Sequence, residues 1–240
     1  MENIGKMPQL VITVLGKYTF TVNHMTILMS WITMAAVLVL AIMATRRLRK
    51  VPGRAQSLME MIVDFFDDVI TETLGKEAGR RFFPFIMTIF FFMLVANWLD
   101  WVPFLDSPTA DLNTPLAVGI LVFIVIHYSS IKHKGFTPYC KSYFEPVAIL
   151  MPLNVVGVLA NIVSLVFRIF GNIMGGGIII IVVSQLVYDF TICHWALYPT
   201  FIANFPMGMF LNFFFVLFVG TVQAFVYTML SLTYIAVQRE

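Results

Sequence analysis

The sequence predicts an all-α polytopic membrane protein. Of its 240 residues 60% are hydrophobic and only 12% are charged, and the mean hydropathy is +0.89. These values lie outside the range of soluble globular domains. Apolar runs long enough to cross a bilayer alternate with short charged segments, which indicates about five membrane-crossing helices. A net charge of +2 is too small to indicate a nucleic-acid partner.

The N-terminal region, residues 1–24, is expected to lie outside the membrane. Two β-prone runs, 10–15 and 18–22, flank Gly16-Lys17, a pattern typical of a hairpin with a two-residue turn. The alternative is a disordered lead-in to the first helix. No basic stretch followed by a hydrophobic run and a cleavage site is present, so we expect no removable signal peptide.

Residues 25–145 are predicted to hold three spans and one amphipathic helix. The first span, about 25–45, is followed by a cluster of arginines and lysine at 46–50, which places that end in the cytoplasm. In 57–75, apolar residues at helical spacing face a row of carboxylates, which favours an amphipathic helix at the cytoplasmic interface. The next two spans are expected near 82–99 and 115–131. The N-terminus is then outside and the C-terminus cytoplasmic, and the two cysteines fall on opposite faces, which argues against a disulfide.

The last region, residues 146–240, is predicted to be a hairpin of two very long antiparallel helices with an outside turn near 189–199. Each helix has about forty residues and would be ~60 Å long, roughly twice the hydrocarbon thickness. Either each helix breaks, with Gly175-Gly176-Gly177 as the break in the first, or the pair is steeply tilted. We expect tilt, because a tilted helix presents one face to a neighbour along its whole length.

That first long helix carries a row of polar and small residues, here called the polar row. Its members recur at steps of three and four and therefore share one helix face. They are Asn154, Gly157, Asn161, Ser164, Arg168, Asn172 and Gly175. Gly171 and Gly175 stand four apart, a spacing that lets another helix approach closely in lipid. A charge at the bilayer centre costs about 2.5–3.5 kcal/mol, and a guanidinium cannot lose its proton, so Arg168 must be paired or hydrated.

The second long helix has a weaker row of its own, which includes Asn212, Gln223, Tyr227 and Ser231. If the two helices pack antiparallel, Gln223 comes near the level of Arg168. The structural alternative is that Arg168 is satisfied by Asn172 and backbone carbonyls, and that the amides and hydroxyls only connect helices.

The run 164–172, Ser-Leu-Val-Phe-Arg-Ile-Phe-Gly-Asn, resembles the motif of subunit a of the F-type ATP synthases. Further matching pieces occur in the same order at 97–100 (Asn-Trp-Leu-Asp), at 108–113 and from Gln223 onward, so the resemblance covers about residues 25–237. It implies a membrane stator in which Arg168 faces ion-binding carboxylates on a rotating ring of c subunits. It also implies contact with the peripheral stalk subunit b and other ATP synthase subunits, a bacterial inner membrane location and no bound cofactor.

The same resemblance, with the expected topology, assigns the polar residues to two half-channels separated by Arg168. The ion-translocation group is Arg168, Gln223 and Asn172, and the close contacts to the c-ring are Gly171 and Gly175. The cytoplasmic half-channel group is Asn161, Ser164, Tyr227 and Ser231. The outer half-channel group is Asn97, Asp100, Asp111, Gln185 and Asn212. For Asp100 and Asp111 the alternatives are helix capping and an acidic vestibule that concentrates cations.

The sequence departs from the family pattern at three positions. Many members carry a carboxylate nine residues after the arginine and a histidine seven before the glutamine, where this chain has Gly177 and Val216. Many also have a lysine where this chain has Asn161. Without these titratable groups, sodium is weakly favoured over a proton as the coupling ion, because sodium needs oxygen ligands and hydration.

Two other function classes fit the sequence less well than a stator. An independent ion or anion carrier or channel would use Arg168 as a substrate site, but five crossings without an internal repeat are few for such a transporter. An intramembrane enzyme would need HExxH, paired intramembrane aspartates or a phosphate-binding glycine loop with lysine, and none occurs. We therefore expect no catalysis, including ATP hydrolysis, by the chain on its own.

Overall fold

The structure is a computed structural model that describes residues 9–14, 18–46, 51–102, 105–144, 149, 151–194 and 200–239. Five of its helical segments are long and apolar enough to cross a membrane, as predicted. The elements in chain order are β1 (Gln9–Val14), β2 (Tyr18–Asn23), α1 (His24–Thr45), α2 (Arg54–Leu74), α3 (Lys76–Trp98), η1 (Leu99–Trp101), η2 (Pro108–Ala110), α4 (Asn113–Lys134), α5 (Phe136–Ser142), α6 (Met151–His194), α7 (Thr200–Asn212), the π-helical η4 (Phe213–Val219) and α8 (Gly220–Arg239).

The predicted N-terminal hairpin is confirmed. β1 and β2 pair antiparallel from Gln9↔Asn23 to Val14↔Tyr18, while the predicted Gly16-Lys17 turn lies outside the described residues. Asn23 ends β2 and also caps α1, because its side-chain oxygen accepts a hydrogen bond from the backbone N–H of Met25 at 3.1 Å. The hairpin therefore leads directly into the first span.

The amphipathic helix is confirmed as α2. Phe66 and Ile70 on its apolar face are buried, and the Phe66 ring packs on Phe90 of α3 with centroids 4.6 Å apart. The carboxylates of the opposite face are exposed. One residue, Gly75, separates α2 from α3 and adopts φ +79°, which L side chains rarely do. The helix of the second span thus begins at Lys76, six residues before the expected position.

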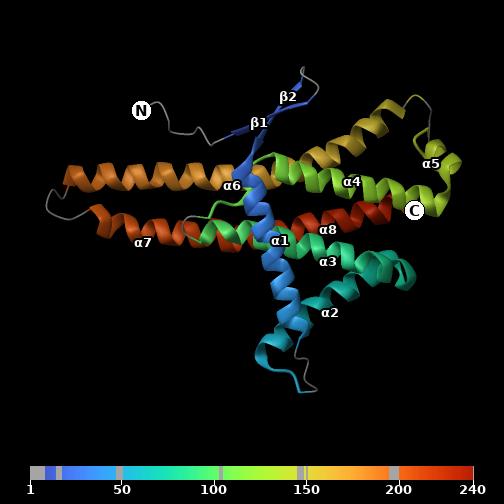
Figure 1. Cartoon of the computed structure of the whole chain (residues 1–240), viewed down its shortest axis with the longest axis horizontal. Helices are drawn as coiled ribbons and strands as arrows, with labels where there is room; N and C mark the ends of the chain where they lie inside the picture. The colour runs from blue at the N-terminus through green and yellow to red at the C-terminus, as the bar shows by residue number, and fades with distance from the viewer. Residues whose placement is uncertain are drawn as a thin grey trace.

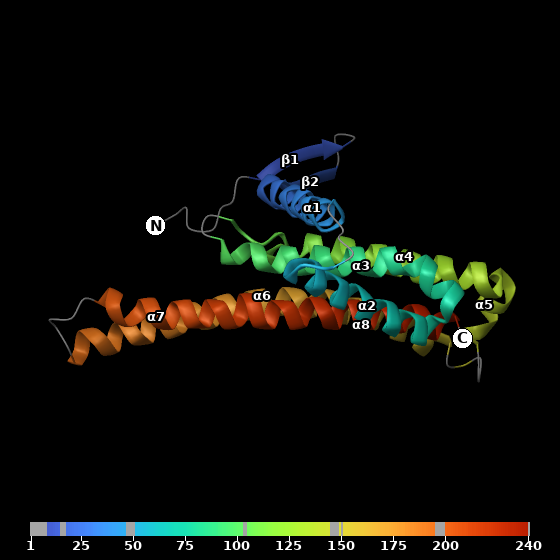
Figure 2. The ribbon, with the colours of Figure 1, turned by 90° about the horizontal axis from the view of Figure 1, so that it is seen from below.

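The helices form three layers when seen along the direction of Figure 2. The hairpin and α1 form one layer, α3 and α4 the middle one, and α6, α7 and α8 with α2 the third. In Figure 1, α1 crosses the long helices steeply, and α6 runs beside α7 and α8. The buried core lies between α2, α3, α4, α6 and α8, with Met93, Val122 and Ile169 among its fully buried side chains.

The first long helix is unbroken. α6 has 44 residues and continues through the glycine run and on to His194, so it extends past residue 189, where the outside turn was expected to begin. At 1.5 Å per residue it is about 66 Å long, so it fits a hydrocarbon layer of ~30 Å only when steeply inclined. The alternative of a break at the glycines is therefore wrong.

The second long helix is interrupted. Between α7 and α8 the backbone adopts π-helical geometry over Phe213–Val219. Such segments are rare and often lie at functional sites. Nothing in the sequence predicted this change.

Three helices meet at Gly119 of α4. A Cβ atom at this position would lie 2.8 Å from Val166 Cγ2 and 3.5 Å from Ile162 Cγ2, both on α6, and 3.9 Å from the Tyr227 hydroxyl oxygen on α8. Only glycine fits this approach without displacement of a neighbour.

We predict that Gly119→Ala destabilises the subunit by about 1–3 kcal/mol, because the added methyl group overlaps the buried Val166 side chain. Thermal denaturation of the purified complex, followed by release of this subunit, measures the effect. Gly157→Ala is the matched control, since a Cβ there meets no atom within 4 Å and the gain in helix propensity is the same. Equal stability of the two variants would contradict the packing described here.

Candidate ion-translocation site

Arg168 is a half-buried cation without a partner in the described part of the chain. Its neighbours on α6, Leu165 and Ile169, are buried in the core and hold this turn of the helix in place. The Nη1 atom is buried and makes no hydrogen bond. Among the described residues the guanidinium makes no hydrogen bond with Asn172 and no ion pair. Because a desolvated cation without a partner is costly, the guanidinium has to be paired or hydrated in the membrane.

The polar row of α6 lies on the surface of the molecule. Asn161, Ser164 and Gly171 are exposed, and a Cβ atom added at Gly171 or Gly175 would meet no atom within 4 Å. Gly176, one position further, is different: its Cβ would lie 3.2 Å from the Phe215 ring. Gly171 and Gly175 thus border open space, whereas Gly176 faces the second long helix.

Gln223 and Tyr227 lie inside the molecule on α8. Gln223 is 9% exposed and Tyr227 is 1% exposed, and the Tyr227 hydroxyl has no partner among the described residues. The contact at Gly119 puts Tyr227 level with Ile162 and Val166. Because α6 and α8 run antiparallel, one turn from Tyr227 toward Gln223 corresponds to one turn from these residues toward Arg168. This arrangement places Gln223 near the level of Arg168.

The residues assigned to the cytoplasmic half-channel fall into two places. Asn161 lines a cavity of about 50 Å³ together with His127 of α4 and Tyr234 and Gln238 of α8. Ser231 is fully buried and donates a hydrogen bond to the Tyr227 carbonyl at 2.8 Å. The structure therefore does not bring Tyr227 and Ser231 together with the exposed Asn161 and Ser164 in one described cavity.

Three of the polar residues on the outer side share one cavity of about 40 Å³. Asn97 at the end of α3 and Asp100 in η1 line it together with Asn172 of α6. At about 10–15 Å³ of such volume per water, the cavity has room for roughly three or four waters. Asn97 is fixed there by two hydrogen bonds, one donated to the Gly220 carbonyl at 2.9 Å and one accepted from the Thr109 hydroxyl at 3.1 Å.

Gly177 and Val216 line this same cavity. These are the two positions at which many subunit a sequences carry titratable groups. The π-helical segment η4 contributes Val216 and Phe215 to the wall, and Gly220 follows directly after it. Two of the three residues that differ from the family pattern, Gly177 and Val216, thus line one cavity although they are 39 positions apart in the sequence.

The remaining outer residues lie elsewhere. Asp111 accepts hydrogen bonds from the Thr26 hydroxyl at 2.9 Å and from the Asn113 backbone N–H at 3.1 Å. It lines a separate, larger pocket of about 250 Å³ with Asp106 and Ser107. Gln185 is exposed and donates to Asp189 at 3.2 Å, while the Asn212 side-chain oxygen is buried without a partner among the described residues.

Sequence reasoning missed the hydroxyl pair that connects the two outer pockets. The hydroxyl groups of Ser107 and Thr109 are 2.6 Å apart, Ser107 donates to the Ala96 carbonyl at 2.8 Å, and Thr109 donates to Asn97. The Ser-Pro-Thr order was the available signal, since Ser107 caps the short helix η2. His127 was not among the predicted site residues either.

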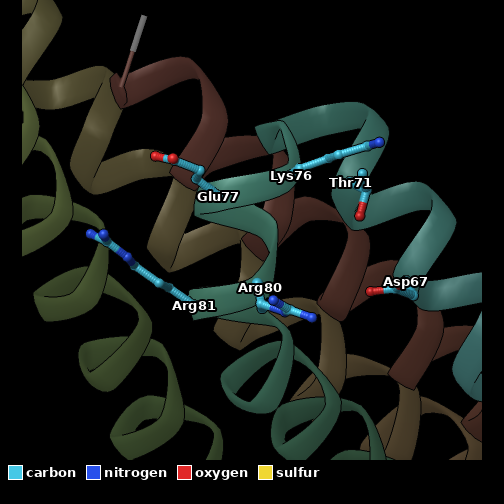
Figure 3. Close-up of a pocket in the computed structure, with 6 residues that line it drawn as sticks. All are labelled: Asp67, Thr71, Lys76, Glu77, Arg80 and Arg81. Atoms are coloured by element: carbon cyan, nitrogen blue, oxygen red, sulfur yellow. The ribbon is translucent and has the colours of Figure 1, made fainter.

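Another pocket, of about 640 Å³, lies at the α2–α3 turn (Figure 3). Six polar side chains line it: Asp67, Thr71, Lys76, Glu77, Arg80 and Arg81. Arg81 extends away from Arg80 and Asp67 in Figure 3. None of these residues belongs to the polar row, and both signs of charge are present. Within the described ranges, no three His, Cys, Asp or Glu residues are placed to hold a metal ion.

Comparison with known proteins identifies the family of the chain. Residues 27–236 match the family described as ATP synthase A chain. The ATP synthase subunit a of Moorella thermoacetica is 34% identical over 213 residues, which cover 89% of each chain. That of Trichlorobacter lovleyi is 37% identical over 86% of this chain and 83% of the relative, and that of Bacillus velezensis 34% over 91% and 93%. The chain therefore belongs to the ATP synthase subunit a family, the ion-translocating part of the stator in the membrane.

Proposed function

We propose that this subunit provides two half-channels that lead ions to and from a rotating c-ring, and that Arg168 separates them. The observation that carries this proposal is the unpaired Arg168 guanidinium beside an open strip of small and polar residues. A carboxylate on a passing helix would satisfy the guanidinium, and Gly171 and Gly175 leave room for that helix.

Electrostatics then explains how Arg168 couples ion transfer to rotation of the ring, acting as a gate between the two half-channels. A carboxylate within ~4–6 Å of a fixed cation is stabilised in its ionised form, so a ring site next to Arg168 releases its ion. The released ion cannot pass the guanidinium. It must leave on one side of Arg168, and the next ion must load on the other, so that net transfer requires rotation of the ring.

For the outer half-channel we propose a route through the two pockets on the Asn97 side of the molecule. Asp106 and Asp111 line the pocket of about 250 Å³, here called the first outer pocket, and attract cations. The cavity of about 40 Å³, here called the second outer pocket, is lined by Asp100 and Asn172. Asp100 is the one carboxylate that lines this second pocket among the described residues. It lies in the same pocket as Gly177 and Val216, the positions at which this chain lacks the titratable groups of the family pattern.

We propose sodium as the coupling ion. The second outer pocket presents carboxylate and amide oxygens and no imidazole among its described lining residues. Oxygen ligands and a few waters suit a hard cation such as sodium. The cytoplasmic route is proposed to run along the Asn161 side of α6, with Ser164.

We further propose that the subunit works in a bacterial plasma membrane with its N-terminus outside and its C-terminus in the cytoplasm, in contact with the c-ring and the peripheral stalk. The stator and the independent carrier differ in a simple test. A stator co-purifies with a small ring-forming protein and is inactive alone in liposomes, whereas a carrier transports alone.

Arg168→Ala is expected to abolish ion-driven ATP synthesis and leave assembly of the complex intact, because the ion can then leak past the gate. Synthesis by reconstituted complexes under an imposed ion gradient measures this. Arg80→Ala, which removes an exposed cation outside the polar row, is the control and should keep coupled synthesis. Coupled synthesis by Arg168→Ala would refute the proposal.

Asp100→Asn is expected to slow ion-driven synthesis by roughly tenfold or more, since it removes the carboxylate of the second outer pocket. Gly177→Glu in the same chain should restore most of the rate, because its side chain starts in open space on the wall of this pocket. Gly176→Glu, whose Cβ meets the Phe215 ring, should not. A normal rate for Asp100→Asn would show that ions take another path.

Sodium is expected to stimulate ATP hydrolysis by the whole complex between pH 7 and 9, because each turn of the ring then depends on sodium loading. Hydrolysis is compared in sodium-free and sodium-containing buffers of equal ionic strength, with potassium as the balancing ion. Equal rates in the two buffers would identify the proton instead.

A further inference from the structure

A half-buried histidine lies at the cytoplasmic end of the described path. His127 of α4 lines the cavity of about 50 Å³ whose other polar walls are Asn161, Tyr234 and Gln238. Nothing in the gate described above uses this imidazole. Histidine is the side chain that ordinarily changes its charge between pH 5 and 8, so its protonation state bears on any cation that passes Asn161.

The hydrogen bonds of His127 define where it can take up a proton. Nδ1 lies 2.8 Å from the Phe123 carbonyl oxygen, which can only accept, so Nδ1 carries a hydrogen. Nε2 lies 3.4 Å from the Tyr143 hydroxyl. The neutral ring therefore has its free lone pair at Nε2, on the side of α5.

Two tyrosines connect Nε2 to the cytoplasmic helix α5. The hydroxyl groups of Tyr143 and Tyr139 are 2.6 Å apart, and the Asn154 amide holds the Tyr143 backbone by donating to its carbonyl at 2.9 Å. Burial, and then the hydrogen bond with Tyr143, raises the pKa of the Tyr139 hydroxyl, which stays protonated. When Nε2 binds a proton from cytoplasmic water, the Tyr143 hydroxyl turns to accept from it, and no other bond has to break.

The resulting imidazolium has no opposite charge nearby in the described structure. The titratable groups that face His127 are Tyr139 and Tyr143 from the α5 side and Tyr234 from α8. No described carboxylate, lysine or arginine lines the cavity. No counter-charge among the lining residues therefore offsets the positive charge, which acts across the cavity on its polar groups, Asn161 among them.

We propose that His127 senses cytoplasmic pH and slows ion passage through the cytoplasmic half-channel when it is protonated. This inference rests on the proposed function, because it needs a cation to pass Asn161. Neutral His127 leaves the path open, and the imidazolium repels the cation. A unit charge acting over about 10 Å at an effective dielectric constant of about 20 changes a rate by roughly tenfold.

The test uses the whole complex in inverted membrane vesicles, whose cytoplasmic face is outside, with the interior pH held constant. ATP-driven ion uptake is measured from external pH 6 to 8.5 for wild type and His127→Gln. The ratio of variant to wild-type rate cancels the pH dependence of the nucleotide sites. It should be near one at pH 8.5 and rise to roughly ten at pH 6.

His133→Gln is the matched control, because His133 is exposed on the same helix and does not line the cavity, and its ratio should stay near one. His127→Lys, a permanent cation, should be slow even at pH 8.5. If His127→Gln fails to assemble, His127→Asn and His127→Lys decide the question. The inference is overturned if the rate ratio of the neutral variants does not depend on pH, or if the lysine variant is fast, while Arg168→Ala still uncouples the complex. Coupled synthesis by Arg168→Ala would overturn the proposed function itself.

Discussion

The architecture depends on one unsatisfied charge held inside an apolar environment. A guanidinium cannot shed its proton, and the described residues around Arg168 offer it no hydrogen bond, although its Nη1 atom is buried. Leu165 and Ile169 fix the helix turn from behind, so the cation cannot easily turn away from the open face. Such a group is stable in lipid only if it is hydrated or paired with negative charge, and in the proposed mechanism a neighbouring subunit supplies that charge.

The rest of the fold holds that charge in a fixed position relative to the proposed half-channels. α6 stays helical for 44 residues, so the polar row is rigid along its length. Gly119 allows α4 to approach both α6 and α8, which sets the level of Gln223 against Arg168. Asn97 bridges the end of α3 to Gly220, next to the π-helical segment, and thereby closes the second outer pocket. Each contact is local, and together these contacts fix how α3, α4, α6 and α8 pack against one another.

Much of this was predictable from the sequence, and the limits have physical reasons. Hydropathy reports partition into lipid, so the five spans came out as predicted. The periodicity of apolar residues identified α2, and β-prone runs around a turn signal identified the N-terminal hairpin. Hydropathy does not report backbone geometry, so neither the π-helical turn at Val216 nor the early start of α3 at Lys76 was expected. The shared pocket of Gly177 and Val216 follows from helix packing across two segments, which spacing along one chain does not reveal. His127 was missed for a related reason: its partners Tyr143 and Asn161 come from other elements.

The most direct test is the structure of the whole complex at a resolution that shows side chains. The guanidinium of Arg168 is expected to face the rotor, with a ring carboxylate within about 4–6 Å and the ring helix packed against Gly171 and Gly175. If Arg168 instead points away from the ring, or is fully hydrogen-bonded within its own subunit, the gate described here does not exist.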